Sequence, residues 1–153
     1  MRITDLLPEA LVLPDLQGQS KGEVLRELAE PMAVQYPQID AGRLVDVLWE
    51  RERLGSTAIG DGIAIPHGKL PGLKSVRAAF GRHLRGVDFD SLDGQPTKLF
   101  FLLIAPDDSV GQHLKALARV SRLLKDAAFR AQLLTAGDRA DLYRRIREED
   151  EKF

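Results

Sequence analysis

The sequence predicts one α/β domain in which a β-sheet lies between helices. Its 153 residues are 44% hydrophobic and 29% charged, which is typical of a folded domain that buries a sizeable core. Apolar residues recur with a helical period up to about residue 55 and alternate with a period of two between Ser56 and Ala105. The helical period returns after Pro106, so the order is helices, strands, helices, and the sheet is expected to carry helices on both faces.

The N-terminal part contains one short strand and one helix. Ala10–Leu13, stopped by Pro14, is the expected strand. Ser20 and Glu23 form a capping box, which predicts a helix immediately after them. Pro31 predicts a kink or an early end of that helix. Its expected buried face is Val24, Leu25, Leu28 and Met32.

The second helix is expected to begin after Asp40, whose carboxylate can cap it, and to end at Leu54-Gly55. Its expected inner face is Leu44, Val47 and Leu48.

Strand patterns fill the middle of the chain. Ile63–Ile65 and Val76–His83 are expected strands, and Val87 and Phe89 alternate towards a turn at Asp93-Gly94. Leu99–Ile104 is continuously apolar, which is typical of a central strand covered on both faces.

Three helices are expected after Pro106, capped by Asp108 or Ser109, by Asp126 and by Asp138. The charged tail Arg144–Lys152 is expected to be a solvated helix end. The side chains expected to face inward are Val110, Leu114, Leu117, Val120, Leu124, Phe129, Leu133, Leu142 and Ile146.

Composition excludes several classes of function. Lys plus Arg is 22 and Asp plus Glu is 23, so the net charge of −1 argues against binding nucleic acid or an anionic membrane surface. The chain has no cysteine, which excludes a disulfide scaffold and a thiol nucleophile and is expected of a cytoplasmic protein. No apolar run approaches the roughly 20 residues of a membrane span, and no signal peptide is visible at Met1–Asp5.

A glycine-rich segment at 51–69 is the densest candidate for chemistry. It does not match a P-loop, because five residues separate Gly62 from Gly68 and Leu70 stands where Ser or Thr must bind magnesium. It does not match a dinucleotide fingerprint either, because Ile65 occupies the place of the third glycine.

His67 lies in this segment between Pro66 and Gly68. Proline fixes the backbone on one side, and glycine permits close approach of a ligand or partner on the other. This setting suits an imidazole nucleophile whose second nitrogen is held by a fixed acceptor. The alternative interpretation is a histidine at a strand end with one satisfied hydrogen bond.

The other two histidines carry weaker signals. His83 ends the expected Val76–His83 strand in a polar stretch and is expected on the surface. His113 lies in the first turn of the Val110–Lys125 helix, where a helix N-terminus favours neutral imidazole and attracts anions; a packed helix-edge residue is the alternative. The three histidines are too far apart in sequence for a metal motif, and no serine lies in a nucleophile elbow.

The segments at 51–57, 60–69 and 111–118 together closely resemble the IIA domains of the bacterial phosphotransferase system. They read Arg-Glu-Arg-Leu-Gly-Ser-Thr, Gly-Asp-Gly-Ile-Ala-Ile-Pro-His-Gly-Lys and Gly-Gln-His-Leu-Lys-Ala-Leu-Ala. The resemblance is to the mannitol/fructose type, most of all its nitrogen-regulatory branch, and extends over residues 1–153 as one IIA type-2 domain.

This resemblance implies an α/β sandwich with a mixed sheet and a role for each site residue. His67 is expected to accept the phosphoryl group, His113 to support the phosphorylated state and Arg51 to lie near the phosphate. Ser56, Thr57 and Gly68 are candidate phosphate contacts. No cofactor and no metal ion are expected.

The resemblance also implies a cytoplasmic protein that takes phosphate from a histidine phosphocarrier protein. The expected function is regulatory, with partners such as potassium-transport proteins or sensor kinases, without nucleic acid or membrane insertion. A sugar-specific IIA component that passes phosphate to a IIB domain is the first alternative. A binding module without phosphotransfer is the second, and monomer and homodimer both remain open.

Overall fold

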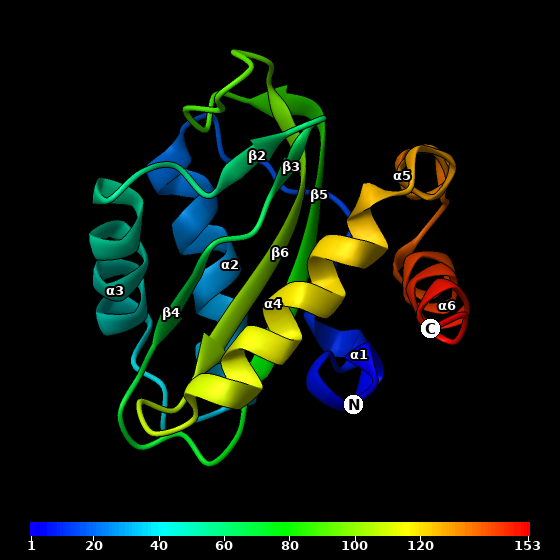
Figure 1. Ribbon diagram of the computed structural model, residues 1–153. Coiled ribbons are helices and arrows are strands. Elements are labelled where there is room, and N and C mark those ends of the chain that lie inside the picture. Colours follow the sequence, from blue (N-terminus) through cyan, green and yellow to red (C-terminus); the bar gives the residue numbers. More distant parts are fainter.

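The computed structural model describes residues 1–153 and is built around one mixed sheet (Figure 1). The strand order is β1-β5-β6-β3-β2, and β4 also pairs with β6. β5 and β6 are antiparallel, whereas β1 is parallel to β5 and both β3 and β4 are parallel to β6. The predicted mixed α/β architecture is therefore confirmed. The strands are β1 (Val12–Leu13), β2 (Ala58–Gly60), β3 (Ile63–Ala64), β4 (His67–Lys69), β5 (Arg77–Val87) and β6 (Thr97–Ala105).

Helices cover both faces of this sheet. In Figure 1, α2 and α3 lie on one side of the strands and α4 lies on the other, with α1, α5 and α6 beyond it. None of these helices is long and apolar enough to cross a bilayer. They are α1 (Ile3–Leu6), α2 (Lys21–Gln35), α3 (Ala41–Arg53), α4 (Val110–Lys125), α5 (Ala127–Thr135) and α6 (Arg139–Asp150), and a 3₁₀ turn spans Glu9–Leu11.

The core is centred on β6, whose residues Leu99–Ala105 are all buried. This confirms the prediction of a central strand covered on both faces. Phe101 packs edge-on against Phe80 of β5, and Phe100 packs in the same way against Phe89. Because strands β3 and β4 pair with β6, the segment that contains His67 is attached to the most rigid part of the molecule.

The predicted capping box is present at α2. Ser20 Oγ accepts a hydrogen bond from the backbone N–H of Glu23 at 3.2 Å. The early end predicted at Pro31 is wrong, because α2 continues to Gln35. Proline inside a helix costs about 3 kcal/mol, but Met32 is fully buried one residue later, and burying a side chain of this size contributes about 1.5–3 kcal/mol. Tertiary packing therefore offsets the missing backbone donor.

Three of the other predicted caps are borne out by hydrogen bonds. The carboxylate of Asp40 accepts from the backbone N–H of Arg43, and Asp126 and Asp138 cap α5 and α6 in the same way. Ser109 occupies the cap position of α4, although its side chain makes no capping bond.

The prediction of a solvated tail is wrong at two residues, because Glu149 and Asp150 are both buried. The carboxylate of Asp150 accepts from the backbone N–H of Ile3 at 2.8 Å and from Arg119 Nε at 2.6 Å. These contacts fasten the end of α6 to the start of the chain. The pattern of charges could not indicate them, because both partners are remote in sequence.

Candidate active site

His67 is the first residue of β4 and is held by its own strand. Its Nδ1 lies 2.8 Å from the carbonyl oxygen of Ile65. The backbone pairs in parallel with β6 at Leu103. A carbonyl oxygen can only accept, so Nδ1 carries the proton and Nε2 keeps its lone pair.

Arg51 approaches the other nitrogen of this ring from the last turn of α3. Its Nε donates to His67 Nε2 at 3.2 Å, and its Nη1 donates to the carbonyl oxygen of Gly55 at 3.0 Å. The prediction that Arg51 and His67 lie together although 16 residues apart is confirmed. A guanidinium N–H can only donate, so this contact also requires an unprotonated Nε2 and agrees with the Ile65 bond.

His113 lies beside His67 in the first turn of α4. The two ring centroids are 5.5 Å apart and the ring planes are nearly perpendicular. His113 is 6% exposed, and neither of its ring nitrogens has a hydrogen-bond partner. Buried polar groups are rarely left unpaired, so this ring has hydrogen-bonding capacity that the protein itself does not use.

Burial lowers the pKa of both imidazoles. At His67, burial is the largest effect and the Arg51 cation acts in the same direction, while the Ile65 hydrogen bond and the Glu52 carboxylate act to raise the pKa. Burial is again the main reason for the lowered pKa of His113, followed by the charges of His67 and Lys69. The lowered pKa of His113 agrees in direction with the predicted preference for the neutral form, and burial is its largest cause.

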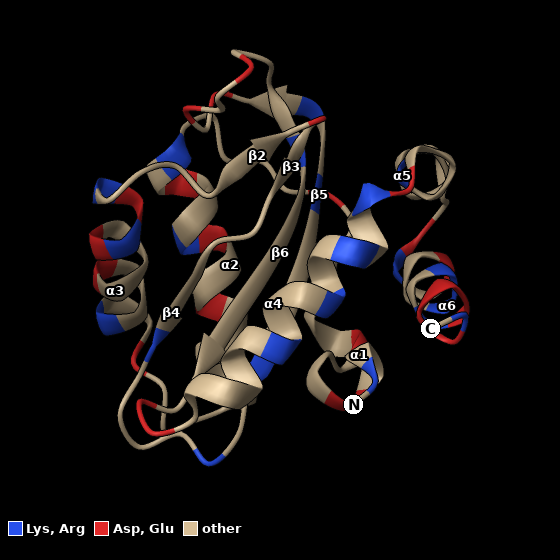
Figure 2. Ribbon diagram, viewed as in Figure 1, with Lys and Arg blue, Asp and Glu red and all other residues tan.

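These side chains line one open pocket of about 500 Å³ between α3, β4 and α4. Two basic residues line it: Arg51 lies in the last turn of α3, and Lys69 ends β4. Figure 2 shows blue segments on both of these elements. A doubly charged phosphoryl group would therefore find cations on two sides of His67.

The rim of the pocket is apolar and exposed. Leu54 is 85% exposed, Val110 50% and Leu114 61%. The prediction that Val110 and Leu114 face the core is wrong, and Leu117 is only partly buried and also lines the pocket. The buried face of α4 consists instead of His113, Ala116, Val120, Leu123 and Leu124. We name Leu54, Val110 and Leu114 the apolar rim.

Gly68 lines the pocket, and its lack of a side chain has a structural reason. A Cβ at this position would lie 2.5 Å from Cγ1 of Val47 on α3. The sequence predicted close approach of a ligand or partner at Gly68, whereas in the structure α3 of the same chain makes that approach, which brings Arg51 within reach of His67.

Ser56 and Thr57 do not line this pocket. The hydroxyl of Ser56 donates to the carbonyl oxygen of Phe89, and that of Thr57 is buried and donates to the carboxylate of Glu52. The structure therefore brings together His67, His113, Arg51 and Gly68, and turns the other two candidate phosphate contacts away.

His83 is not on the surface as predicted. It is buried, its Nε2 lies 2.7 Å from the carbonyl oxygen of Gly18, and its Nδ1 accepts from the backbone N–H of Gly86. Both nitrogens are satisfied, and the ring joins the loop before α2 to the end of β5. This histidine has a structural role away from the pocket.

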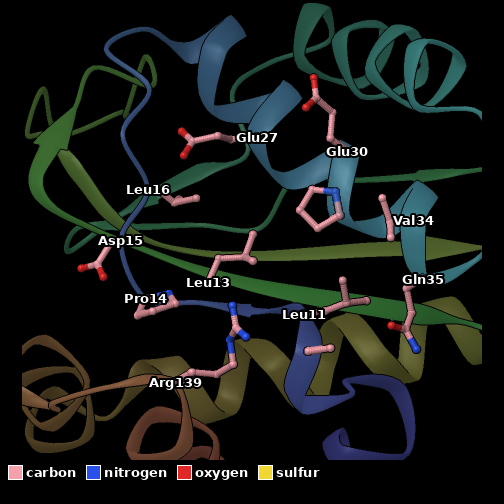
Figure 3. Close-up of a pocket in the computed structure, with 12 residues that line it drawn as sticks. Leu11, Leu13, Pro14, Asp15, Leu16, Glu27, Glu30, Val34, Gln35 and Arg139 are labelled. Carbon is pink, nitrogen blue, oxygen red and sulfur yellow. The ribbon is translucent and has the colours of Figure 1, made fainter.

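A larger hollow of about 740 Å³ lies at the β1 edge of the sheet, far in strand order from β4 (Figure 3). It contains no histidine. Glu27 accepts from the backbone N–H groups of Gln17 and Gly18, and Arg139 donates to the carbonyl oxygen of Val12. These charged groups are committed to the fold, so size alone does not identify the reactive site.

Sequence patterns missed three functional features of the reactive site. These are the apolar rim, Lys69 as a flanking cation, and the carbonyl oxygen of Ile65 that fixes the imidazole. No side-chain signal marks a carbonyl group. Val110 and Leu114 are exposed because no other element of the chain covers them, which their helical spacing does not reveal.

Comparison with protein families decides the classification. Residues 5–149 match the model described as "Phosphoenolpyruvate-dependent sugar phosphotransferase system, EIIA 2". The chain belongs to this EIIA type 2 family. The predicted membership of the mannitol/fructose type is thereby confirmed.

Relatives within the family include regulatory and transport proteins. A "Nitrogen regulatory protein" of Bradyrhizobium diazoefficiens is 46% identical over 94% of this chain and 93% of its own length. The "PTS system fructose-specific EIIABC component" of Bacillus subtilis is 38% identical over 89% of this chain but only 21% of its own length.

Solved structures give the same result. The nitrogen regulatory protein IIA-Ntr of Neisseria meningitidis superposes with a TM-score of 0.88 at 30% identity, covering 94% of this chain and 98% of that one. The IIA mannitol structure of Escherichia coli has a TM-score of 0.74 at 18% identity, covering 90% of this chain and 96% of that one, and shows the shared fold.

Proposed function

We propose that this EIIA domain accepts a phosphoryl group on Nε2 of His67 from a histidine phosphocarrier protein and that the phosphorylated form acts as a regulatory signal. The observation that carries the proposal is the opposed pair of contacts on one imidazole: Ile65 holds the proton on Nδ1, and Arg51 approaches the lone pair on Nε2.

The transfer is a displacement between two imidazole nitrogens. The Nε2 lone pair of His67 attacks phosphorus while the N–P bond of the donor phosphohistidine breaks, and the donor nitrogen recovers the electron pair. The proton on Nδ1 stays in place and continues to donate to the carbonyl oxygen of Ile65. No proton has to leave His67 for the new bond to form.

Arg51 has two successive partners in this sequence of events. In the unphosphorylated chain its Nε occupies the lone pair that must attack. Phosphorus therefore displaces this hydrogen bond, and the guanidinium turns its planar set of donors to the phosphoryl oxygens. Its Nη1 contact with Gly55 keeps it at the site meanwhile.

His113 supplies a further donor. As a neutral ring it has one N–H group, and neither nitrogen has a partner in the protein. A phosphoryl oxygen on His67 is a suitable acceptor, and Lys69 adds positive potential nearby. Phosphoryl transfer depends mainly on such positioning and charge stabilisation, which these side chains supply.

The apolar rim suits a protein donor rather than a free metabolite. A phosphohistidine on a protein surface reaches Nε2 only when the two surfaces touch around the pocket, and exposed Leu and Val side chains gain from that contact. Phosphorylation places nearly two negative charges at the centre of the same surface and so changes which partner docks there. Similarity to nitrogen regulatory proteins over nearly their full length supports the regulatory role.

The decisive test is incubation with phosphoenolpyruvate and the two upstream phosphotransferase proteins. We expect one phosphoryl group per chain on His67, with ³¹P–¹⁵N coupling to Nε2. His67→Gln should remain unlabelled while keeping its fold. Label on His83, label on Nδ1 of His67, or a chain that stays unmodified and so behaves as a pure binding module would each overturn the proposal.

A sugar-specific role is the second candidate, favoured by the similarity to the fructose-specific protein of Bacillus subtilis. The phosphorylated chain would then pass its phosphate to a IIB domain. Addition of purified fructose-type and mannitol-type IIB domains separates the two functions. A regulatory protein should retain its label over minutes, whereas a transport component should discharge rapidly.

A further inference from the structure

A buried cluster of polar side chains lies directly behind the reactive pocket. Glu52 is only 6% exposed, although it is a carboxylate at the C-terminal end of a helix. Its Oε1 accepts from the backbone N–H of Thr57 at 3.0 Å, and its Oε2 accepts from the hydroxyl of Thr57. Lys21 of α2 completes the group, with Nζ 2.9 Å from Oε1. We call Lys21, Glu52 and Thr57 the Glu52 cluster.

The cluster connects to His67 through the backbone. The carbonyl oxygen of Thr57 accepts from the N–H of Ile65 at 3.1 Å, and the carbonyl oxygen of Ile65 holds His67 Nδ1 at 2.8 Å. A displacement of Thr57 would therefore move the group that fixes the tautomer of the reactive imidazole.

The same turn also positions Arg51. Glu52 is the next residue in the helix, and its carbonyl oxygen accepts from the N–H of Gly55 at 3.0 Å. The carbonyl oxygen of Gly55 in turn accepts from Arg51 Nη1 at 3.0 Å. Both partners on the imidazole of His67 are thus attached to the turn that the Glu52 carboxylate closes.

We propose that Glu52 is a positioning residue, whose buried carboxylate holds the turn at 53–57 so that His67 presents an unprotonated Nε2 to incoming phosphorus. The inference rests on the proposed phosphoryl-accepting function of His67. It assigns a role to the Glu of the Arg-Glu pair at 51–52, for which the sequence provided none, and explains why the hydroxyl of Thr57 is turned away from the pocket.

Stability of the fold is a weak explanation for this arrangement. A buried ion pair gains little over apolar residues of similar volume, because desolvation of both charges offsets their attraction. Lys21 is further surrounded by Phe89 and Trp49, with its ammonium 4.8 Å and 5.7 Å from their ring centroids. An apolar replacement would fit this setting, whereas only a carboxylate accepts from both donors of Thr57 and from lysine.

The test uses Glu52→Gln, with Asp46→Asn as the matched control. Asp46 is exposed on the same helix, lies outside the pocket, and loses the same charge on substitution. Glu52→Gln leaves the ammonium of Lys21 with only the exposed carboxylate of Asp90, 3.3 Å away, as a charged partner. The double variant Lys21→Met/Glu52→Gln is therefore included to keep a folded protein. Thr57→Ser and Thr57→Val form a second pair, since serine retains the hydroxyl donor and valine retains the shape.

The first readout is the tautomer of His67, measured from ¹⁵N shifts of the ring in the unphosphorylated protein. We expect the wild type and Asp46→Asn to show protonated Nδ1 and unprotonated Nε2. Glu52→Gln, the double variant and Thr57→Val should show averaging between the two tautomers, and Thr57→Ser should restore the wild-type spectrum. This readout is independent of phosphoryl transfer.

The second readout is the initial rate of phosphoryl acceptance. Loss of a residue that orients a metal ligand typically costs about 10–100-fold in affinity or activity, and we expect the same range for Glu52→Gln and the double variant, in which an orienting contact to a reacting imidazole is lost. Folded variants with wild-type tautomer spectra and wild-type rates overturn the inference. If the wild type accepts no phosphate, the proposed function fails, while the tautomer spectra still decide the role of Glu52.

Discussion

Replacing Arg51 by lysine separates the charge of this side chain from its shape. Arg51 holds His67 Nε2 and the carbonyl oxygen of Gly55 simultaneously, through two different nitrogens of one planar group. A lysine ammonium is a single point on a flexible stem and cannot reproduce that pair of contacts. Arg51→Lys therefore keeps the positive charge near the pocket and removes the directed donors.

The expected size of the effect follows from the bonds lost. A charge-assisted hydrogen bond contributes about 1.5–3 kcal/mol, and a tenfold change in rate corresponds to about 1.4 kcal/mol. Losing one such bond to a phosphoryl oxygen in the transition state predicts transfer slower by about 10- to 150-fold. Arg51 is partly exposed, so the free energy of unfolding should change by less than about 1 kcal/mol.

The assay is a rapid-quench time course of phosphoryl acceptance at saturating donor. Arg53→Lys is the control, because Arg53 lies in the same helical turn but is exposed and outside the pocket. Arg53→Lys should match the wild type. An Arg51→Lys rate within twofold of the wild type would show that charge alone is required. It would refute the idea that the two directed contacts of Arg51 matter for transfer.

Three further predictions follow from the same site. His113→Ala should still be labelled on His67, but labelling should be slower by a factor at the low end of the about 10²–10⁴-fold range for hydrogen-bond or acid–base assistance. His113→Asn should have a smaller effect. Unchanged labelling rates in both variants would show that His113 has only a packing role. Burial lowers the pKa of both imidazoles in the folded chain. As the pH falls, these histidines therefore become protonated in the unfolded chain near their ordinary pKa of 6.5, at a higher pH than in the folded chain. The free energy of unfolding should therefore decrease as pH falls from about 6.5 towards the lowered folded-state pKa values. Denaturant titrations at a series of pH values measure this decrease, and the dependence on pH should be weaker in His67→Gln. Leu114→Glu should raise the KM for the phosphocarrier protein with little change in kcat, whereas Leu92→Glu, at an exposed position outside the pocket, should leave both constants unchanged.

Local signals allowed much of the fold and the centre of the site to be predicted. The cap residues Ser20 and Asp40 specify helix starts through bonds to residues three positions away, so the sequence alone reveals them. The apolar run of β6 likewise needs no partner to be recognised as central. The three residues Arg51, His67 and His113 were identified by motif, and the structure brings their side chains together.

The features that were not predicted all depend on remote contacts. His83 is buried because the carbonyl of Gly18, 65 residues away, accepts from its ring. Val110 and Leu114 carry the helical period of a buried face, but no element of the chain covers them. The tautomer of His67 is set by a backbone carbonyl. Every residue has such a group, and only the folded structure determines which side chain it points towards.

A half-buried His67 and a buried His113 inside an exposed apolar rim would reconcile two requirements of phosphoryl transfer between proteins. The nucleophile must stay neutral and the N–P bond must be kept from water, and withdrawing these rings from solvent serves both requirements. The site must nevertheless open to a second protein, so no segment of this chain can cover it. In the proposed function, the partner completes the enclosure by packing on Leu54, Val110 and Leu114. On this argument, substitutions in the rim should alter docking and those at Arg51 should alter the chemical step, which is why the two classes are expected to separate into KM and kcat.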